Sequence, residues 1–174
     1  MDWNKLKEAY KFKNLDSETM DLIADCSAST KLCAKVLFPD YFESPFSKLA
    51  DQIFDVLDDE KERRVVIAAP RGFGKTSIVM IPYAARRILY MMKRFIVPVS
   101  NSLTLAEMQS ENLKQALVTN PLIHKIFGNV RMGKVDKDET TETFSKKAWV
   151  ANGYTIVLPR GSFQQVRGLL FRGR

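Results

Sequence analysis

Apolar residues recur at spacings of three and four over positions 1–60, so this part of the chain is predicted to be a helical segment. Asp16–Glu18 supply an N-cap and an acidic first turn for one helix. A second apolar periodicity stops at Phe38-Pro39, because the residue before a proline is pushed out of the helical region. A third helix is expected to begin at Ser47 and to end in Asp58–Glu60. Its expected buried face comprises Leu49, Ile53, Phe54, Val56 and Leu57.

The next hydrophobic run, Val65–Ala68, is short and β-branched, which is typical of a strand buried on both faces. It leads into Ala69–Ser77, a segment with two glycines, after which Ile78–Ile81 resumes helical spacing. A strand, a glycine-containing loop and a helix in this order are the context of a phosphate-binding loop, where loop N–H groups and the helix N-terminus converge on phosphates. Pro82 is expected to kink the helix or shorten its regular part.

Within this loop, the residue types match the chemistry of nucleotide binding. Gly72 and Gly74 permit unusual dihedrals and close approach of the backbone. Lys75 reaches the β and γ phosphates, and the Thr76 hydroxyl ligates Mg²⁺. The predicted nucleotide-binding residues are Ala69, Pro70, Arg71, Gly72, Phe73, Gly74, Lys75, Thr76 and Ser77. Ala69 departs from the general pattern G-x-x-x-x-G-K-[ST], in which its position holds the first glycine, and a chance turn is the alternative.

Arg71 lies inside the loop, three positions before Gly74. An arginine there could point into solvent or pair with a surface acid. Beside a γ phosphate, however, its guanidinium would stabilise charge on the transferring group as an arginine finger does, here in cis. Lys75 and Arg71 are therefore the predicted catalytic residues.

After the loop, strands and helices alternate, which predicts an α/β fold with a parallel sheet. Phe95–Val99 is interpreted as a strand whose ladder is interrupted at Pro98. Thr104–Glu107 has capping-box spacing before an amphipathic helix. Pro121 is expected to open a short helix that Gly128 stops. Two further β segments are predicted to turn at Asn152-Gly153.

The amino-acid composition indicates which class of protein the chain belongs to. At 174 residues, 45% hydrophobic and 27% charged, the chain is expected to be one soluble globular domain, made of a helical segment (1–60) and a P-loop core (61–174). Cys26 and Cys33 are expected to pack as reduced thiols of an intracellular protein, and His124 to lie at or near the surface. No window reaches the roughly 18 apolar residues of a membrane span, so no membrane partner is expected.

The charge is consistent with a polyanionic partner without identifying one. The net charge is +7, and from Thr143 to Arg174 there are six basic residues and no acidic ones. A solvated basic face is the alternative interpretation of this stretch.

These segments together resemble the ATPase domain of the large terminase subunits, which package DNA into the procapsids of tailed bacteriophages. The resemblance covers residues 38–169. It rests on Phe38-Pro39, the helix with Gln52, Val66–Thr76, the strand into Ser100-Asn101-Ser102, and Gln164–Leu169. It implies a P-loop NTPase fold of the ASCE type, in which helices flank a parallel sheet.

The resemblance also implies roles for particular residues. The family residue that matches Arg71 is a proposed cis arginine finger, and a glutamine placed like Gln52 contacts adenine. Gln165, Arg167 and Gly168 would take part in coupling or in sensing DNA or phosphate. The implied cofactors are ATP and Mg²⁺. The implied partners are double-stranded DNA, the portal protein, the small terminase subunit and further copies in a ring, in the cytoplasm of the infected bacterial host and transiently on the procapsid.

A terminase follows the segment matching Arg167-Gly168 with an apolar strand closed by Asp and Glu, which hold magnesium and orient the attacking water. None of the acidic residues after Lys75 ends such a strand. The sequence is therefore expected to stop before this Walker B strand and the family's nuclease domain, and to hydrolyse ATP slowly by itself. A helicase-like DNA-dependent ATPase and a nucleotide-gated assembly module that does not hydrolyse ATP are the alternatives.

Overall fold

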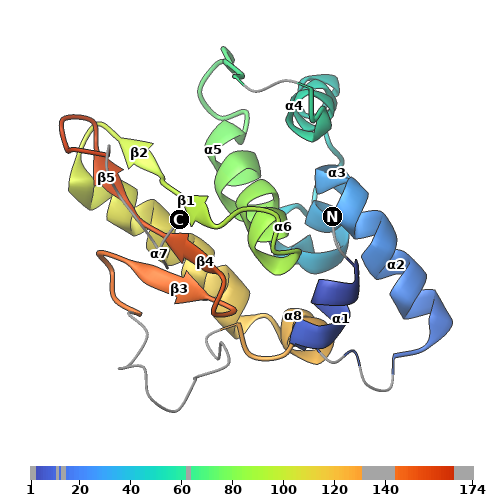
Figure 1. The fold of residues 1–174 in the computed structure, drawn as a ribbon. Coiled ribbons are helices and arrows are strands. Elements are labelled where there is room, and N and C mark those ends of the chain that lie inside the picture. Colours follow the sequence, from blue (N-terminus) through green and yellow to red (C-terminus); the bar gives the residue numbers. More distant parts are fainter. Residues whose placement is uncertain (1–2, 11, 13–14, 62–63, 131–143, 167–174) are drawn as a thin grey trace, which may run out of the picture. The chain divides into compact units, whose positions relative to one another are not determined.

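The computed structural model describes residues 3–10, 12, 15–61, 64–130 and 144–166, and they form a mixed α/β protein (Figure 1). The chain divides into two compact units. Residues 12–86 form the helical unit, and residues 1–11 with 87–174 form the sheet unit. This boundary differs from the expected division at residue 60, because helices before that position pack with the helix that follows the glycine loop.

The helical unit begins with three helices whose starts are fixed by side-chain caps. These are α2 (Ser17–Ala28), α3 (Thr30–Leu37) and α4 (Lys48–Asp58), with the 3₁₀ turn η1 (Pro39–Tyr41) between the last two. Asp16 accepts a hydrogen bond from the Thr19 N–H at 2.7 Å, and Ser47 accepts one from the Ala50 N–H at 3.2 Å. The predicted caps and the break at Phe38-Pro39 are therefore confirmed.

Helix α4 is central to one core cluster of the helical unit. Its buried residues are Ala50, Ile53, Phe54 and Leu57, which pack with Ala34 and Ile78. The expectation that Val56 is buried is wrong, since 42% of this residue is exposed. The buried stripe follows spacings of three and four residues, which leaves position 56 to its side.

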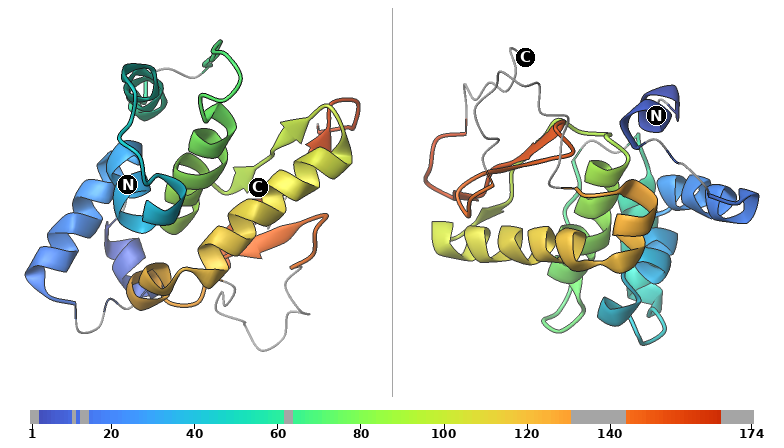
Figure 2. Two further views of the ribbon diagram at one scale, coloured as in Figure 1. Left: turned by 180° about the vertical axis from the view of Figure 1, so that it is seen from behind. Right: turned by 90° about the horizontal axis from the view of Figure 1, so that it is seen from below.

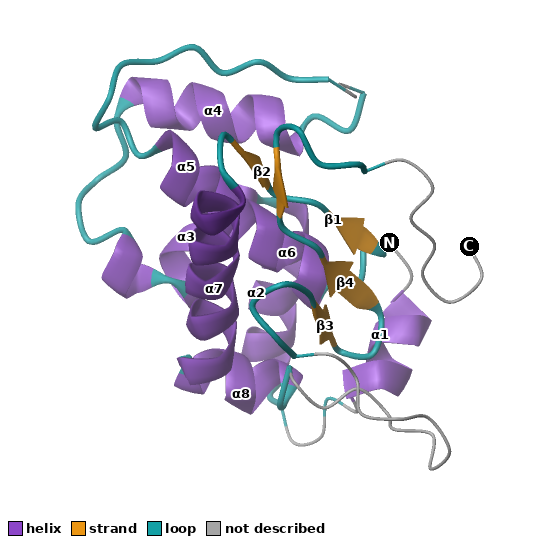
Figure 3. Cartoon of the chain, turned by 90° about the vertical axis from the view of Figure 1, so that its left-hand side faces the viewer, coloured by secondary structure: helices purple, strands orange, loops and turns teal. Residues whose placement is uncertain are grey.

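The predicted strand Val65–Ala68 is not formed, and the segment is a loop in Figure 3. Ile67 packs against the core of the helical unit, but Val66 is 94% exposed. β-branched residues favour an extended backbone, yet a strand also needs a neighbour that completes its hydrogen-bond ladder. None of the described segments pairs with these residues, so the expectation of burial on both faces is wrong.

The helix after the glycine loop changes its winding around Pro82. It consists of α5 (Lys75–Ile78), a π-helical turn η2 (Val79–Tyr83) and α6 (Ala84–Leu89), which follow one another without a break. Pro82 has no N–H for the α-helical ladder, and the Ala84 N–H bonds to the Val79 carbonyl five residues earlier. The predicted limit on the regular helix at Pro82 is confirmed.

The sheet unit contains short strands in two groups. Its strands are β1 (Phe95–Ile96), β2 (Val99–Ser100), β3 (Trp149–Ala151), β4 (Thr155–Val157) and β5 (Arg160–Gly161). One group has the order β1-β4-β3, with β1 parallel and β3 antiparallel to β4, and the other pairs β2 with β5 in parallel. The three-stranded sheet is therefore mixed. The expected parallel pairing holds for β1 with β4 and for β2 with β5, but not for β3 with β4.

Pro98 explains why β1 and β2 are separate strands. Four N–H groups of residues 156–162, the segment that contains β5 and part of β4, donate in succession to carbonyls along positions 94–100. The donor and acceptor pairs are Ile156 to Arg94 (2.8 Å), and Leu158 to Ile96, Arg160 to Pro98 and Ser162 to Ser100 (2.9 Å each). Pro98 contributes its carbonyl but has no N–H to return a bond, so the ladder is interrupted where the sequence predicts it.

The hairpin between β3 and β4 turns at Asn152-Gly153, as predicted, with φ values of 54° and 60°. The Tyr154 N–H closes the turn on the Ala151 carbonyl at 2.9 Å. Two consecutive positive φ values define the tight hairpin turns that favour Asn-Gly. Asn152 also donates through Nδ2 to the buried hydroxyl of Tyr10 in α1 (Trp3–Tyr10).

Gly153→Ala should lower the free energy of unfolding by about 1 kcal/mol, because alanine is strained at positive φ. Urea titration measures the change. Gly153→Asn should lose less, since asparagine tolerates left-handed backbone. Equal stability of the alanine variant and the unchanged protein would show that this turn does not constrain the hairpin.

Helices α7 (Leu103–Thr119) and α8 (Pro121–Phe127) complete the sheet unit, and α7 lies along the strands (Figure 2). The N-cap of α7 is Ser102, which accepts from the Leu105 N–H at 3.2 Å, so the predicted cap at Thr104 is wrong by two residues. Ser102 has the extended backbone that a cap requires. Gly128, at φ 72°, ends α8 as predicted. Large, fully buried side chains of this core include Trp149, Tyr90, Leu6, Ile88, Leu89, Leu113, Leu117 and Ile123.

Candidate functional site

The segment Ala69–Gly74, here called the glycine loop, connects residues 65–68 to α5. Gly72 has φ 86° and Gly74 has φ 67°, both in the left-handed region. A Cβ atom on either glycine would meet no other atom within 4 Å. Glycine is therefore required here by the backbone dihedrals and not by lack of space.

The loop ends at the start of a helix. The first helical hydrogen bond runs from the Ile78 N–H to the Gly74 carbonyl at 2.9 Å. The N–H groups of the first turn, at positions 75–77, precede that bond and have no carbonyl partner within the helix. Thr76 and Ser77 are exposed. Such a turn favours an anion, because its N–H groups and the helix dipole present partial positive charge.

The Lys75 side chain folds back over the loop. Its Nζ donates to the carbonyl of Ala69 at 2.5 Å and to that of Pro70 at 2.6 Å. These contacts hold the ammonium group on the loop, beside the exposed first turn of α5. A phosphate bound there would meet the ammonium and the N–H groups together.

Arg71 is exposed and makes no hydrogen bond or ion pair with any residue that the structure describes. No described residue therefore holds its guanidinium away from a ligand on the loop.

An open cleft of about 570 Å³ adjoins the loop within the helical unit. One side is the segment Asp40–Ser47 with Ala50 of α4, and the other is Gly72–Gly74 with Ile78 of α5. Four aromatic side chains line it: Tyr41, Phe42, Phe46 and Phe73. The Phe46 ring packs on Phe54 of the core at a centroid distance of 4.8 Å, which fixes this wall. This wall was not predicted, although the aromatic residues that follow Phe38-Pro39 in the sequence were a signal for it.

The other predicted site residues are not among the residues that line the cleft, or they lie outside the described residues. Gln52 is exposed on α4 and is not among the residues that line the cleft. Gln165 belongs to the sheet unit. Arg167 and Gly168 lie outside the described residues.

Polar and thiol groups elsewhere offer no preformed metal site in the described part of the chain, where no cluster of three or more His, Cys, Asp or Glu side chains occurs. Cys26 and Cys33 are buried, as predicted. Burial raises the pKa of Cys26 to about 11, so this group is a thiol and not a thiolate ligand at neutral pH. His124 is exposed, and its Nε2 contacts the Val118 carbonyl. Among the described helices, none combines the length and apolarity needed to cross a membrane.

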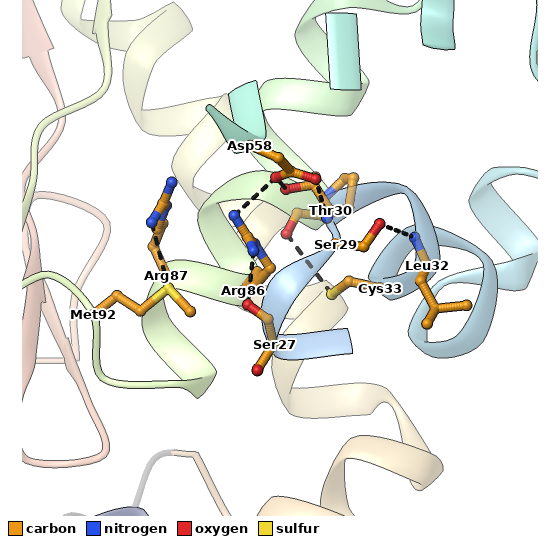
Figure 4. A network of polar contacts seen from close by, with 10 residues as sticks. Ser27, Ser29, Thr30, Leu32, Cys33, Asp58, Arg86, Arg87 and Met92 are labelled. Carbon is orange, nitrogen blue, oxygen red and sulfur yellow. Dashed lines mark hydrogen bonds and ion pairs between the residues drawn. The ribbon is translucent and has the colours of Figure 1, made fainter. Parts of the chain in front are cut away.

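A buried polar network joins the helices around the loop (Figure 4). Arg86 of α6 pairs with Asp58 at the end of α4 at 2.8 Å and donates to the Ser27 carbonyl at 2.7 Å. Asp58 also accepts from the N–H and the hydroxyl of Thr30, at 2.7 and 2.5 Å. The side chains of Arg86 and Asp58 are only 3% and 19% exposed. The network therefore links the C-terminal ends of α2 and α4 and the first residue of α3 to Arg86 within α6.

Comparison with known proteins gives no match to this chain among family models, curated proteins or solved structures.

Proposed function

We propose that the chain binds ATP with Mg²⁺ through Ala69–Ser77, as the nucleotide-binding part of a DNA-packaging motor of the large terminase type. One observation carries the binding proposal: two left-handed glycines lead into a helix start, and the Lys75 ammonium lies over the same loop. Backbone donors and a cation at one exposed turn support phosphate binding there.

Each loop group has a defined task in this proposal. The N–H groups at positions 75–77 would bind the phosphate oxygens, and the Lys75 ammonium would exchange the carbonyls of Ala69 and Pro70 for phosphate. The exposed Thr76 hydroxyl would hold Mg²⁺, which neutralises charge on the phosphates. Arg71 would contact the γ phosphate.

The cleft beside the loop is suited to the nucleoside half of ATP. Tyr41 and Phe73 are 51% and 44% exposed, so their rings are open to a planar base. Polar groups at the rim, including Asp40 and Ser47, offer acceptors for the ribose or base. Gln52 is not needed for this contact, because it is not part of the lining.

The motor activity is proposed from the resemblance of residues 38–169 to terminase ATPase domains and from the net charge of +7. It implies double-stranded DNA, the portal protein and the small terminase subunit as partners, a ring of copies, and action in the infected host cytoplasm.

Calorimetry with ATP and Mg²⁺ tests the binding proposal. Lys75→Ala is expected to weaken ATP affinity about 10- to 100-fold, because it removes the only loop ammonium that reaches the phosphates. Lys125→Ala, which removes an exposed lysine of α8 in the sheet unit, is the matched control and should bind as the unchanged protein does. Equal affinity of all three folded proteins, or no binding by any of them, would refute the proposal.

A further inference from the structure

Helices α4 and α5 each contribute one residue to the cleft, and the same two stretches of helix are also joined at a second point. Helix α4 contributes Ala50 to the cleft and carries Asp58 eight residues later. The helix after the loop contributes Ile78 and carries Arg86 eight residues later. Eight residues correspond to about 12 Å along a helix. The cleft and the Asp58–Arg86 pair thus mark two separate points at which the same two helices meet.

Apolar packing connects these two points. Ile53, Phe54 and Leu57 of α4 belong to the same core cluster as Ala50 and Ile78, and Val79 and Tyr83 of η2 pack against that cluster. Protein cores are packed densely and transmit displacements of one element to its neighbours. A change in the spacing of the helices at Asp58 and Arg86 would therefore be transmitted to Ala50 and Ile78, which line the cleft.

The chain between Asp58 and Arg86 contains the whole glycine loop. The ion pair closes this stretch of 28 positions at its ends, and a closed stretch has less conformational freedom than an open one. Arg86 also reaches the Ser27 carbonyl, and Asp58 reaches Thr30, so the closure is anchored to the junction of α2 and α3 (Figure 4). The pair is well placed to define where the loop lies against the wall formed by residues 40–47.

We infer that Asp58 and Arg86 are positioning residues for the nucleotide, which hold the glycine loop at the distance from the wall formed by residues 40–47 and Ala50 that a bound base requires. The inference rests on the proposed function. The phosphate contacts are made by the loop and the first turn of α5 alone, whereas the base contacts need both walls. Loss of the pair should therefore weaken the binding of ATP more than the binding of a ligand that has phosphates and no base.

The experiment compares Mg²⁺-ATP with Mg²⁺-tripolyphosphate by calorimetry. The double variant Asp58→Ala/Arg86→Met removes the pair without leaving one buried charge unpaired. ATP affinity should fall about tenfold, because the base loses its contacts, while tripolyphosphate affinity should stay within about twofold. The matched control is Lys31→Met/Asp51→Ala, which removes an exposed ion pair of 2.8 Å that also joins α3 to α4. It should bind both ligands as the unchanged protein does.

If the double variant does not fold, Arg86→Lys replaces it. Lysine keeps the charge but lacks the fork that reaches Asp58 and the Ser27 carbonyl together, so the loss should be smaller and again confined to ATP. Equal losses for ATP and tripolyphosphate, or no loss for either, would overturn the positioning role while the proposed nucleotide binding stands. If the unchanged protein bound neither ligand, the proposed function itself would fail and the inference with it.

Discussion

Arg71→Ala is expected to lower the rate of ATP hydrolysis by the proposed motor about 10³-fold or more, with little effect on ATP affinity. The reason is that a guanidinium beside the γ phosphate stabilises charge that develops in the transition state, and differential binding is what changes the chemical step. Arg71 is exposed inside the loop and has no competing contact with the described residues. Single-turnover hydrolysis measures the chemical step apart from binding and product release.

Two further variants separate this role from a general effect of charge. Arg71→Lys should restore little activity, because lysine lacks the planar fork that meets two phosphate oxygens. Arg64→Ala removes another exposed arginine, outside the loop, and should leave the rate nearly unchanged. A rate for Arg71→Ala close to that of the unchanged protein would remove Arg71 from the catalytic residues.

Asp58→Ala is expected to lower the free energy of unfolding by about 3 kcal/mol, because it leaves the Arg86 guanidinium buried without its counter-charge. It also removes the acceptor for the Thr30 N–H and hydroxyl. Urea titration followed by circular dichroism measures the loss.

Asp51→Ala is the control on the same helix. Its partner Lys31 is 40% exposed, and exposed ion pairs contribute about 0 to 1 kcal/mol. A loss for Asp58→Ala no larger than that of Asp51→Ala would show that the buried network does not stabilise the helical unit.

Local signals in the sequence predicted the elements whose structure is set by near neighbours. Asp16 and Ser47 are caps because their side chains bond to an N–H three residues later. Asn152-Gly153 is a turn because both positions adopt positive φ. Pro82 alters its helix because it has no N–H. Each of these outcomes depends on a few consecutive residues.

Features that depend on distant residues were not predictable in the same way. Val65–Ala68 has strand-like composition, but pairing depends on a neighbouring strand that its own sequence does not specify. The pairing of Asp58 with Arg86 joins positions 28 residues apart. The aromatic wall of the cleft likewise forms only when residues 40–47 come to lie beside the loop. The glycine-containing turn before α5 was predicted, because Gly72, Gly74 and Lys75 lie close together in the sequence.

Backbone NMR of the chain titrated with ATP and Mg²⁺ tests the central claim most directly, because it reports where the nucleotide binds. The largest shifts are expected for the amides of Gly72, Gly74 and residues 75–77, which would bond to phosphate, with smaller shifts along residues 40–47 of the cleft. The same titration on Lys75→Ala should require a higher nucleotide concentration for the same shifts. Unchanged loop amides at saturating nucleotide, or shifts confined to the sheet unit, would contradict the assignment of Ala69–Ser77 as the nucleotide-binding loop.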